Sequence, residues 1–137
     1  GAARWLGGTP SIPALYAATE GPKLVRRAGI DAIREKSLRH TTRLIALADE
    51  RGYAVTAPRD AARRGGTVAF DVPHGAEVSQ ELLARDVVID YRPGAGIRVA
   101  PHFYTTDDEV ERVVREVDDI LATAAWKRHE SSRRVVT

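Results

Sequence analysis

The sequence contains no cysteine and no methionine, and only three of its 21 basic residues are lysines. The absence of cysteine excludes disulfides, thiolate metal ligands and a cysteine nucleophile, and we expect a protein of a reducing compartment, the cytoplasm. Because translation starts with methionine, the glycine at residue 1 indicates a chain that has been trimmed, tagged or cut from a longer one. Any search for a lysine that does covalent chemistry is confined to Lys23, Lys36 and Lys127.

A large charge excess and long apolar runs are also missing. The net charge is only +2, with acids and bases interspersed, so we expect neither nucleic acid nor a membrane as a partner. No apolar run approaches the roughly 20 residues of a membrane-spanning helix. What is present is a chain of 137 residues, 43% hydrophobic and 29% charged, which is typical of one folded domain with one core.

Helical patterns dominate the first part of the chain. Glycines and prolines predict a loop over residues 1–12, after which a helix begins near Pro13 and is interrupted at Gly21–Pro22. A long helix is predicted over residues 30–51, and Gly52 stands where a C-cap glycine belongs. The apolar stripe predicted for this long helix comprises Ile30, Ile33, Leu38, Thr41, Leu44, Ile45 and Ala48.

The middle of the chain predicts a small sheet. Strands are expected at residues 53–58, 67–72, 86–90 and 97–101, with a short helix over residues 75–85. Short links within each strand pair favour antiparallel pairing. Together with the flanking helices, this order predicts an α+β fold: a small, mostly antiparallel sheet covered on one face by helices and preceded by a long helix.

The last helix carries the clearest start signal of the chain. Thr106 and Glu109 have the spacing of a capping box, and apolar residues repeat at helical spacing from Val110 onward. Residues 127–137 are expected to be loosely ordered. We therefore divide the chain into an interdomain loop (1–12), a C-terminal small domain (13–125) and a tail (126–137).

Most familiar catalytic patterns are not present. The four histidines have no pair at metal-ligating spacing, so no metal site is expected, and the serines lack a nucleophile-elbow pattern. The glycine–threonine pair Gly8–Thr9, just before a helix, can offer backbone amides and a hydroxyl to a phosphate. From these residues alone, a plain turn is the simpler interpretation.

Arg98 is the residue whose role this reasoning leaves open. It lies between Ile97 and Val99, in an apolar run that ends in aromatic residues. One interpretation is a strand arginine that faces solvent beside an acidic neighbour, which is the commoner case. The other is a charge held for a ligand, because the planar guanidinium suits bidentate binding of a carboxylate.

Five segments of the chain occur together in a characteristic order: "GGTPSIPALYAA", "IDAIREKSLRHTTRLI", "RGGTVAFDV", "DVVIDYRPGAGIRVAPHFYTTDDEVERVV" and the final "RVVT". In this order they resemble the C-terminal part of kynureninase and, more widely, the class V aminotransferase group that includes the cysteine desulfurases. The resemblance covers nearly the whole chain, from about Gly7 to Leu121. Within it, Arg64–Gly66 matches a lip near the substrate mouth, to which we assign no contact.

The resemblance implies a fold-type I enzyme that uses pyridoxal 5′-phosphate and works as a homodimer with active sites at the subunit interface. It implies that Gly8 and Thr9 contact the cofactor phosphate of the neighbouring subunit. It also implies that Arg98 binds the α-carboxylate of an amino-acid substrate. His102 and Tyr104, just past this arginine, are candidates to line the same pocket.

The resemblance further implies that much of the enzyme lies outside this chain. In the family, a large N-terminal domain holds the Schiff-base lysine, the aspartate that pairs with the pyridine nitrogen and the aromatic residue that stacks on the ring. We therefore expect a C-terminal domain that is inactive alone, contributes no catalytic residue, and has that large domain and a second subunit as partners. A kynureninase-like hydrolase is favoured over an aminotransferase or a lyase, and the lack of cysteine disfavours a desulfurase. The alternative of another class is a stand-alone, non-catalytic interaction module.

Overall fold

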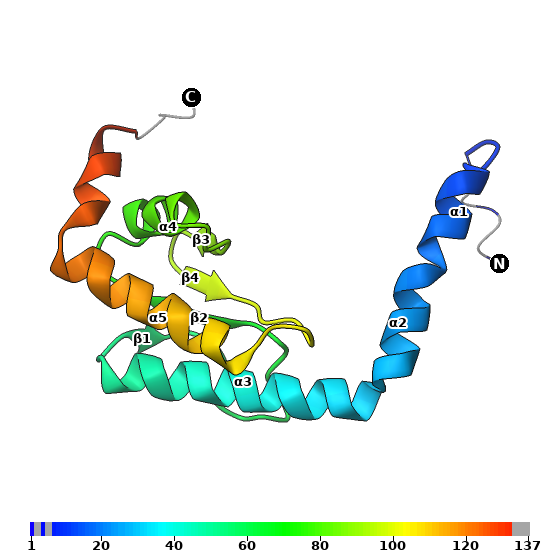
Figure 1. The fold of residues 1–137 in the computed structure, drawn as a ribbon, viewed down its shortest axis with the longest axis horizontal. Coiled ribbons are helices and arrows are strands. Elements are labelled where there is room, and N and C mark those ends of the chain that lie inside the picture. The colour runs from blue at the N-terminus through cyan, green and yellow to red at the C-terminus, as the bar shows by residue number, and fades with distance from the viewer. Residues whose placement is uncertain (2–3, 5–6, 133–137) are drawn as a thin grey trace. The chain divides into compact units, whose positions relative to one another are not determined.

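The computed structural model describes residues 1, 4 and 7–132. The chain forms two compact units, one of residues 1–35 and one from residue 36 onward. Figure 1 shows the order of the helices and strands. The "RVVT" segment, residues 134–137, lies outside the described residues. The division at residues 1–12, 13–125 and 126–137 stays a prediction.

Two short helices make up most of the first unit. α1 spans Ile12–Ala18 and α2 spans Glu20–Ala28, so the predicted helical segment is present but its break lies at Thr19 rather than Gly21–Pro22. Proline is tolerated in the first turn of α2, because an N–H there has no intrahelical partner to lose. Neither helix contains a buried residue.

The predicted long helix is confirmed. α3 spans Ile30–Glu50, and Gly52 ends it with a φ of 71°, its N–H donating to the carbonyl of Asp49 at 3.0 Å. The left-handed conformation at this C-cap is the one that glycine adopts at low cost. The predicted stripe is wrong at Ile30, which is 66% exposed. The buried residues of α3 are His40, Thr41, Leu44, Ile45, Leu47 and Ala48.

Four strands form one antiparallel sheet in the order β1-β2-β4-β3. Both predicted strand pairs are antiparallel as expected, and β2 and β4 join the pairs at the centre of the sheet. The strands are β1 (Ala54–Val55), β2 (Val68–Asp71), β3 (Asp90–Arg92) and β4 (Gly96–Val99).

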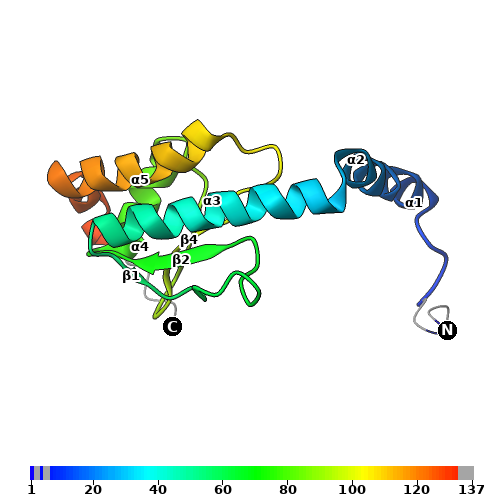
Figure 2. The same cartoon turned by 90° about the horizontal axis from the view of Figure 1, so that it is seen from below.

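The core lies on one face of this sheet. Figure 2 shows α3 and α5 (Asp107–Ala122) on the same side of β1, β2 and β4. Because side chains alternate along a strand, one set of strand residues enters the core while the residues between them face away. This arrangement confirms the predicted α+β class with helices over one face. The core includes Val68 and Phe70 of β2, Ile97 and Val99 of β4, Val78 and Leu82 of α4 (Gly75–Ala84), and Val114 and Val117 of α5.

The strand predicted at residues 86–90 is misplaced, because β3 and its pairing with β4 begin only at Asp90 and continue to Arg92. The preceding residues are held by the end of α4 instead, where the N–H of Val87 donates to the carbonyl of Leu82 at 2.9 Å. The connecting turn is therefore shorter than predicted and comprises residues 93–95.

α5 begins at the predicted capping box and runs parallel to α3. The hydroxyl of Thr106 accepts the N–H of Glu109 at 3.2 Å, and the N–H of Thr106 donates to the Glu109 carboxylate at 2.7 Å. Hydrogen bonds with His40 and then Arg39 hold the pKa of Asp107, the first residue of α5, below its usual 3.8. Three ion pairs join α3 and the residue after it to α5 at a nearly constant sequence spacing, as parallel helices require (Figure 1): Arg39–Asp107, Arg43–Glu111 and Arg51–Asp118.

The segment after α5 is ordered as far as it is described. Ala125–Ser132 forms a 3-10 helix, η2, that packs against α4 and α5. The Trp126 ring stacks on His74 at 3.4 Å between centroids, and His129 Nε2 lies 2.9 Å from a carboxylate oxygen of Glu81. The prediction that residues 127–132 are loosely ordered is therefore wrong.

Candidate functional site

Arg98 lies on the face of the sheet that the helices leave uncovered. Its neighbours Ile97 and Val99 are buried in the core, so the alternation of β4 turns Arg98 to the opposite face. Its cross-strand partners are Ala69 of β2 and Asp90 of β3, and the three form a row across the sheet. The Arg98 side chain is 42% exposed, which leaves it open to a ligand.

The guanidinium of Arg98 is held by one carboxylate. Its Nη2 donates to Oδ2 of Asp90 at 2.5 Å, and Nε of Arg92 donates to the same oxygen at 3.1 Å. The Nε of Arg98 is buried and has no acceptor among the residues that the structure describes. Since an arginine carries five N–H groups, the Nη1 pair and one N–H of Nη2 are left for an external anion.

Gly8 and Thr9 belong to the first unit. They form a bend that is exposed to solvent, and a Cβ at Gly8 would meet nothing within 4 Å. The backbone amides and the Thr9 hydroxyl are the donors that a phosphate requires.

His102 and Tyr104 form a small aromatic group in the loop after β4. Their rings stack at 4.4 Å between centroids, and Tyr104 is 73% exposed. Among the described residues, no hydrogen bond or ring contact joins either of them to Arg98. Their place in the substrate pocket therefore stays a prediction.

Arg64, in the segment that matches the family's lip, is a structural residue. It is only 5% exposed, and its Nε donates to the hydroxyl of Thr41 at 3.1 Å. Its Nη2 donates to Thr42 at 2.9 Å, and its Nη1 donates to the carbonyl of Arg59 at 2.7 Å. Arg64 thus ties the loop between β1 and β2 to α3, a role that sequence reasoning missed.

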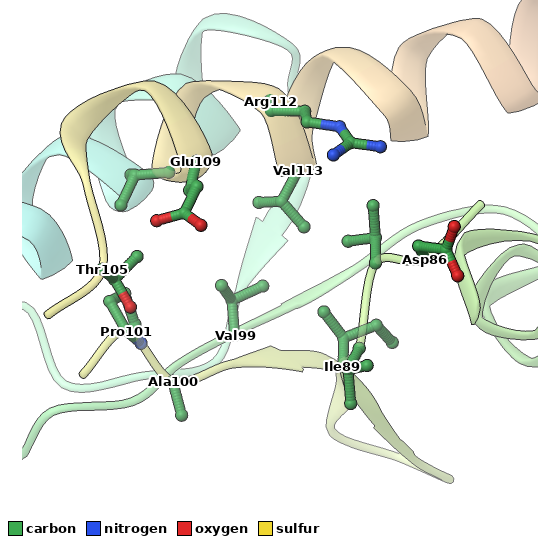
Figure 3. A pocket seen from close by; sticks show the side chains of 12 residues that line it. Asp86, Ile89, Val99, Ala100, Pro101, Thr105, Glu109, Arg112 and Val113 are labelled. Atoms are coloured by element: carbon green, nitrogen blue, oxygen red, sulfur yellow. The ribbon is translucent and has the colours of Figure 1, made fainter.

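A groove of about 210 Å³ opens on the other side of the sheet, where residues 86–89 separate from β4. Figure 3 shows Glu109 and Arg112 of α5 facing Val99 and Ile89 across it. Arg98 is not part of its lining, because Val99 rather than Arg98 points to this side. This groove is therefore separate from the arginine's face of the sheet.

Two further findings concern the described residues only. No group of three or more histidine, aspartate or glutamate side chains in residues 1, 4 and 7–132 is arranged to hold a metal ion. Within the same ranges, every helix is too short or too polar to span a membrane.

A family model described as the kynureninase C-terminal domain matches residues 33–117, which include most of α3, the whole sheet and Arg98. The chain belongs to the kynureninase C-terminal domain family. The kynureninase of Burkholderia mallei (strain SAVP1) is 35% identical over an alignment of 139 positions, and the match covers 98% of this chain and 33% of that protein. The kynureninase of Geobacillus thermodenitrificans is 31% identical over 134 residues, covering 94% of this chain and 31% of that protein. The chain thus spans about a third of the length of these relatives.

Solved structures share the fold of this chain. A cysteine desulfurase from Thermococcus onnurineus matches with a TM-score of 0.79 at 22% identity, over 88% of this chain and 34% of that one. A NifS-like protein matches with a TM-score of 0.73 at 15% identity, over 85% of this chain and 35% of that one. These likenesses confirm the predicted fold, and the family match confirms the resemblance.

Each lysine of the chain has a neighbour in the structure. Lys36 Nζ donates to the carbonyl of Phe103 at 2.8 Å, which anchors the loop after β4. Lys23 pairs with Glu20 at 2.6 Å. Lys127 Nζ lies 5.7 Å from the centre of the ring of the preceding tryptophan.

Proposed function

We propose that the full-length protein is a cytoplasmic, homodimeric, pyridoxal-phosphate-dependent hydrolase of kynurenine, and that this chain supplies Arg98 as the anchor for the substrate's α-carboxylate. One observation carries the proposal. The guanidinium of Arg98 lies on the uncovered face of the sheet, 42% exposed, with N–H groups left unused by its carboxylate partner. Membership of the kynureninase family and the 35% identity to a kynureninase support the activity.

An arginine is suited to this role because its fork fixes both the position and the rotation of a carboxylate. The bond to be broken at the substrate's Cα must keep a set angle to the cofactor ring, and two parallel N–H···O bonds restrict that rotation. When bound, pyridoxal phosphate supplies the electron sink for bond breaking at the amino acid. The part of Arg98 is to bind and orient the substrate.

Gly8 and Thr9 fit the phosphate of that cofactor by the chemistry of their donors. Two amides and a hydroxyl lie in an exposed bend with open space around Gly8. We assign them a contact with the phosphate of cofactor held mainly by the neighbouring subunit. We assign the lysine that binds the cofactor to the N-terminal part of the full-length protein, as the family resemblance implies.

The first unit supports the assignment of partners outside this chain. Its helices have no buried residue, and short helices are marginal in water without packing. Since the relatives are about three times as long as this chain, the N-terminal large domain is the partner we assign to this apolar surface, together with the second subunit. The large exposed apolar side chains of α1 and α2 are Ile12, Leu15, Tyr16 and Leu24.

The test is an Arg98→Lys substitution in the full-length protein, with Kd measured for a non-reactive analogue of L-kynurenine and for pyridoxal phosphate. Lysine keeps the charge but not the fork, so we expect substrate affinity to fall on the order of tenfold to a hundredfold. Cofactor affinity is expected to stay unchanged. Unchanged affinity for the substrate removes Arg98 from the site.

A further inference from the structure

Asp90 lies directly opposite Arg98 in the sheet. We propose that Asp90 is a positioning residue: it fixes the guanidinium of Arg98 in the orientation that receives a carboxylate, while Arg92 offsets its negative charge. The inference rests on the proposed function, because it takes Arg98 as the carboxylate anchor.

The strand register places Asp90 where it can do this. Asp90 and Arg98 are directly opposite each other in the β3–β4 ladder, so both side chains leave the same face of the sheet. On the other side of Arg98 the register places Ala69, which has no polar group to offer. Among the described residues, Asp90 is therefore the one side chain that holds the guanidinium.

The buried Nε shows which edge of the guanidinium is presented. Because Nε of Arg98 is buried without an acceptor, the edge that contains it cannot meet a ligand. The Nη atoms form the remaining edge, and Asp90 holds one N–H of Nη2. A buried N–H group without an acceptor is unfavourable, so the unpaired Nε does not explain the rotamer of Arg98. We therefore attribute the orientation of the guanidinium to the ion pair with Asp90.

Arg92 offsets the negative charge of Asp90. Asp90 alone would cancel the charge of Arg98 and weaken its attraction for a carboxylate. The Nε of Arg92 bonds to the same oxygen of Asp90, so two cations and one anion leave the cluster with one net positive charge. Asp90 therefore removes rotamer freedom from Arg98 before binding, and the attraction for an anion remains.

The experiment uses full-length, cofactor-loaded protein and two ligands for binding, a non-reactive analogue of L-kynurenine and the corresponding amine that lacks the carboxylate, with L-kynurenine as the substrate for kinetics. The variants are Asp90→Ala, Asp90→Asn and Arg98→Gln. Asp49→Asn is the matched control, because Asp49 is 44% exposed against 43% for Asp90 and is also paired with an arginine, at 2.7 Å. Calorimetry gives Kd for each ligand, and steady-state kinetics give KM and kcat.

We expect Asp90→Ala to raise the Kd of the non-reactive analogue and the KM of L-kynurenine on the order of tenfold, and to leave the Kd of the amine unchanged. Asp90→Asn keeps an acceptor in place and should restore most of the affinity. Asp49→Asn should behave as wild type. Because the ratio of the two Kd values is taken within one variant, a loss of folded protein cancels from it.

Three results overturn the inference. If Asp90→Ala leaves the ratio unchanged while Arg98→Gln raises it, Asp90 does not position the arginine and the proposed function stands. If Asp90→Ala weakens both ligands equally, its role is structural only. An unchanged ratio in Arg98→Gln overturns the proposed function together with this inference.

Discussion

Replacing Gly96 with alanine should unfold the hairpin that carries Arg98. Gly96 has a φ of 87°, and a Cβ built on it would lie 2.3 Å from the carbonyl oxygen of Phe70 and 2.8 Å from the Cα of Asp71. Both contacts are with the backbone of the central strand β2, which cannot rotate away as a side chain can. The substitution therefore adds a steric clash to the cost of a left-handed conformation.

Gly94, in the same hairpin, separates these two costs. Its φ is 78°, but a Cβ there would meet nothing within 4 Å. Gly94→Ala should therefore cost only the conformational term, about 1–2 kcal/mol. Gly96→Ala adds the displacement of a core strand, for which we expect a total loss of about 4 kcal/mol or more, the range of severe core substitutions.

Urea unfolding of this chain, followed by circular dichroism, measures both variants against wild type. We expect the urea concentration at the unfolding midpoint to decrease slightly for Gly94→Ala. For Gly96→Ala we expect a far larger decrease, or no folded baseline. Equal midpoints for the two variants would refute this reasoning, because the contact with Phe70 would then have no energetic consequence.

Two further predictions concern α5 and the C-terminal helix η2. Thr106→Ala removes the hydroxyl that caps α5 and should lower the free energy of unfolding by about 1 kcal/mol in urea titrations, and an unchanged midpoint would contradict the capping role. Hydrogen bonding to His129, and then to Arg85, lowers the pKa of Glu81 below 4.5. The ionised Glu81 carboxylate therefore contributes fully to the stability of the fold above pH 4.5, and this contribution is lost as the pH falls through the lowered pKa. Fluorescence of Trp126, in a Trp5→Phe background, should report release of η2 in this acidic window, and Glu81→Gln should abolish the transition; an unaltered transition in this variant would refute the link.

Local signals account for the parts of the fold that could be predicted. The capping box at Thr106 and the C-cap at Gly52 each depend on a few neighbouring residues, and both are present. The apolar repeat of α3 is long enough to identify a helix, although Ile30, at its exposed start, shows that the repeat does not tell which end is covered.

The wrong predictions concern segments whose structure is set by contacts with another element or by the exact position of a residue in a helix. Residues 86–89 have a β-branched composition, but the end of α4 holds them away from β4. The segment after α5 looks polar, yet it is ordered through Glu81, 48 residues before His129. The sequence predicted a helix break at Gly21–Pro22, whereas Pro22 lies in the first turn of α2.

The role of Arg98 in substrate binding stays a prediction, whereas the structure adds the neighbour that holds its side chain. Arg98 was identified through the family resemblance, whereas Asp90 was missed, although the sequence contained a signal for it. With a three-residue turn at residues 93–95, antiparallel pairing of the flanking strands places residue 90 opposite residue 98. The prediction of a strand at residues 86–90 hid this register. Arg64 was missed for another reason, since its partners on α3 are 22 and 23 residues away in sequence.

The central claim is that Arg98 binds the substrate's α-carboxylate, and a crystal structure of the full-length, cofactor-loaded protein with a non-reactive kynurenine analogue tests it most directly. The account predicts both carboxylate oxygens within about 3 Å of the Nη atoms of Arg98. It also predicts that Asp90 still accepts from Nη2. A carboxylate bound by other side chains, with Arg98 paired to Asp90 alone, would contradict the account.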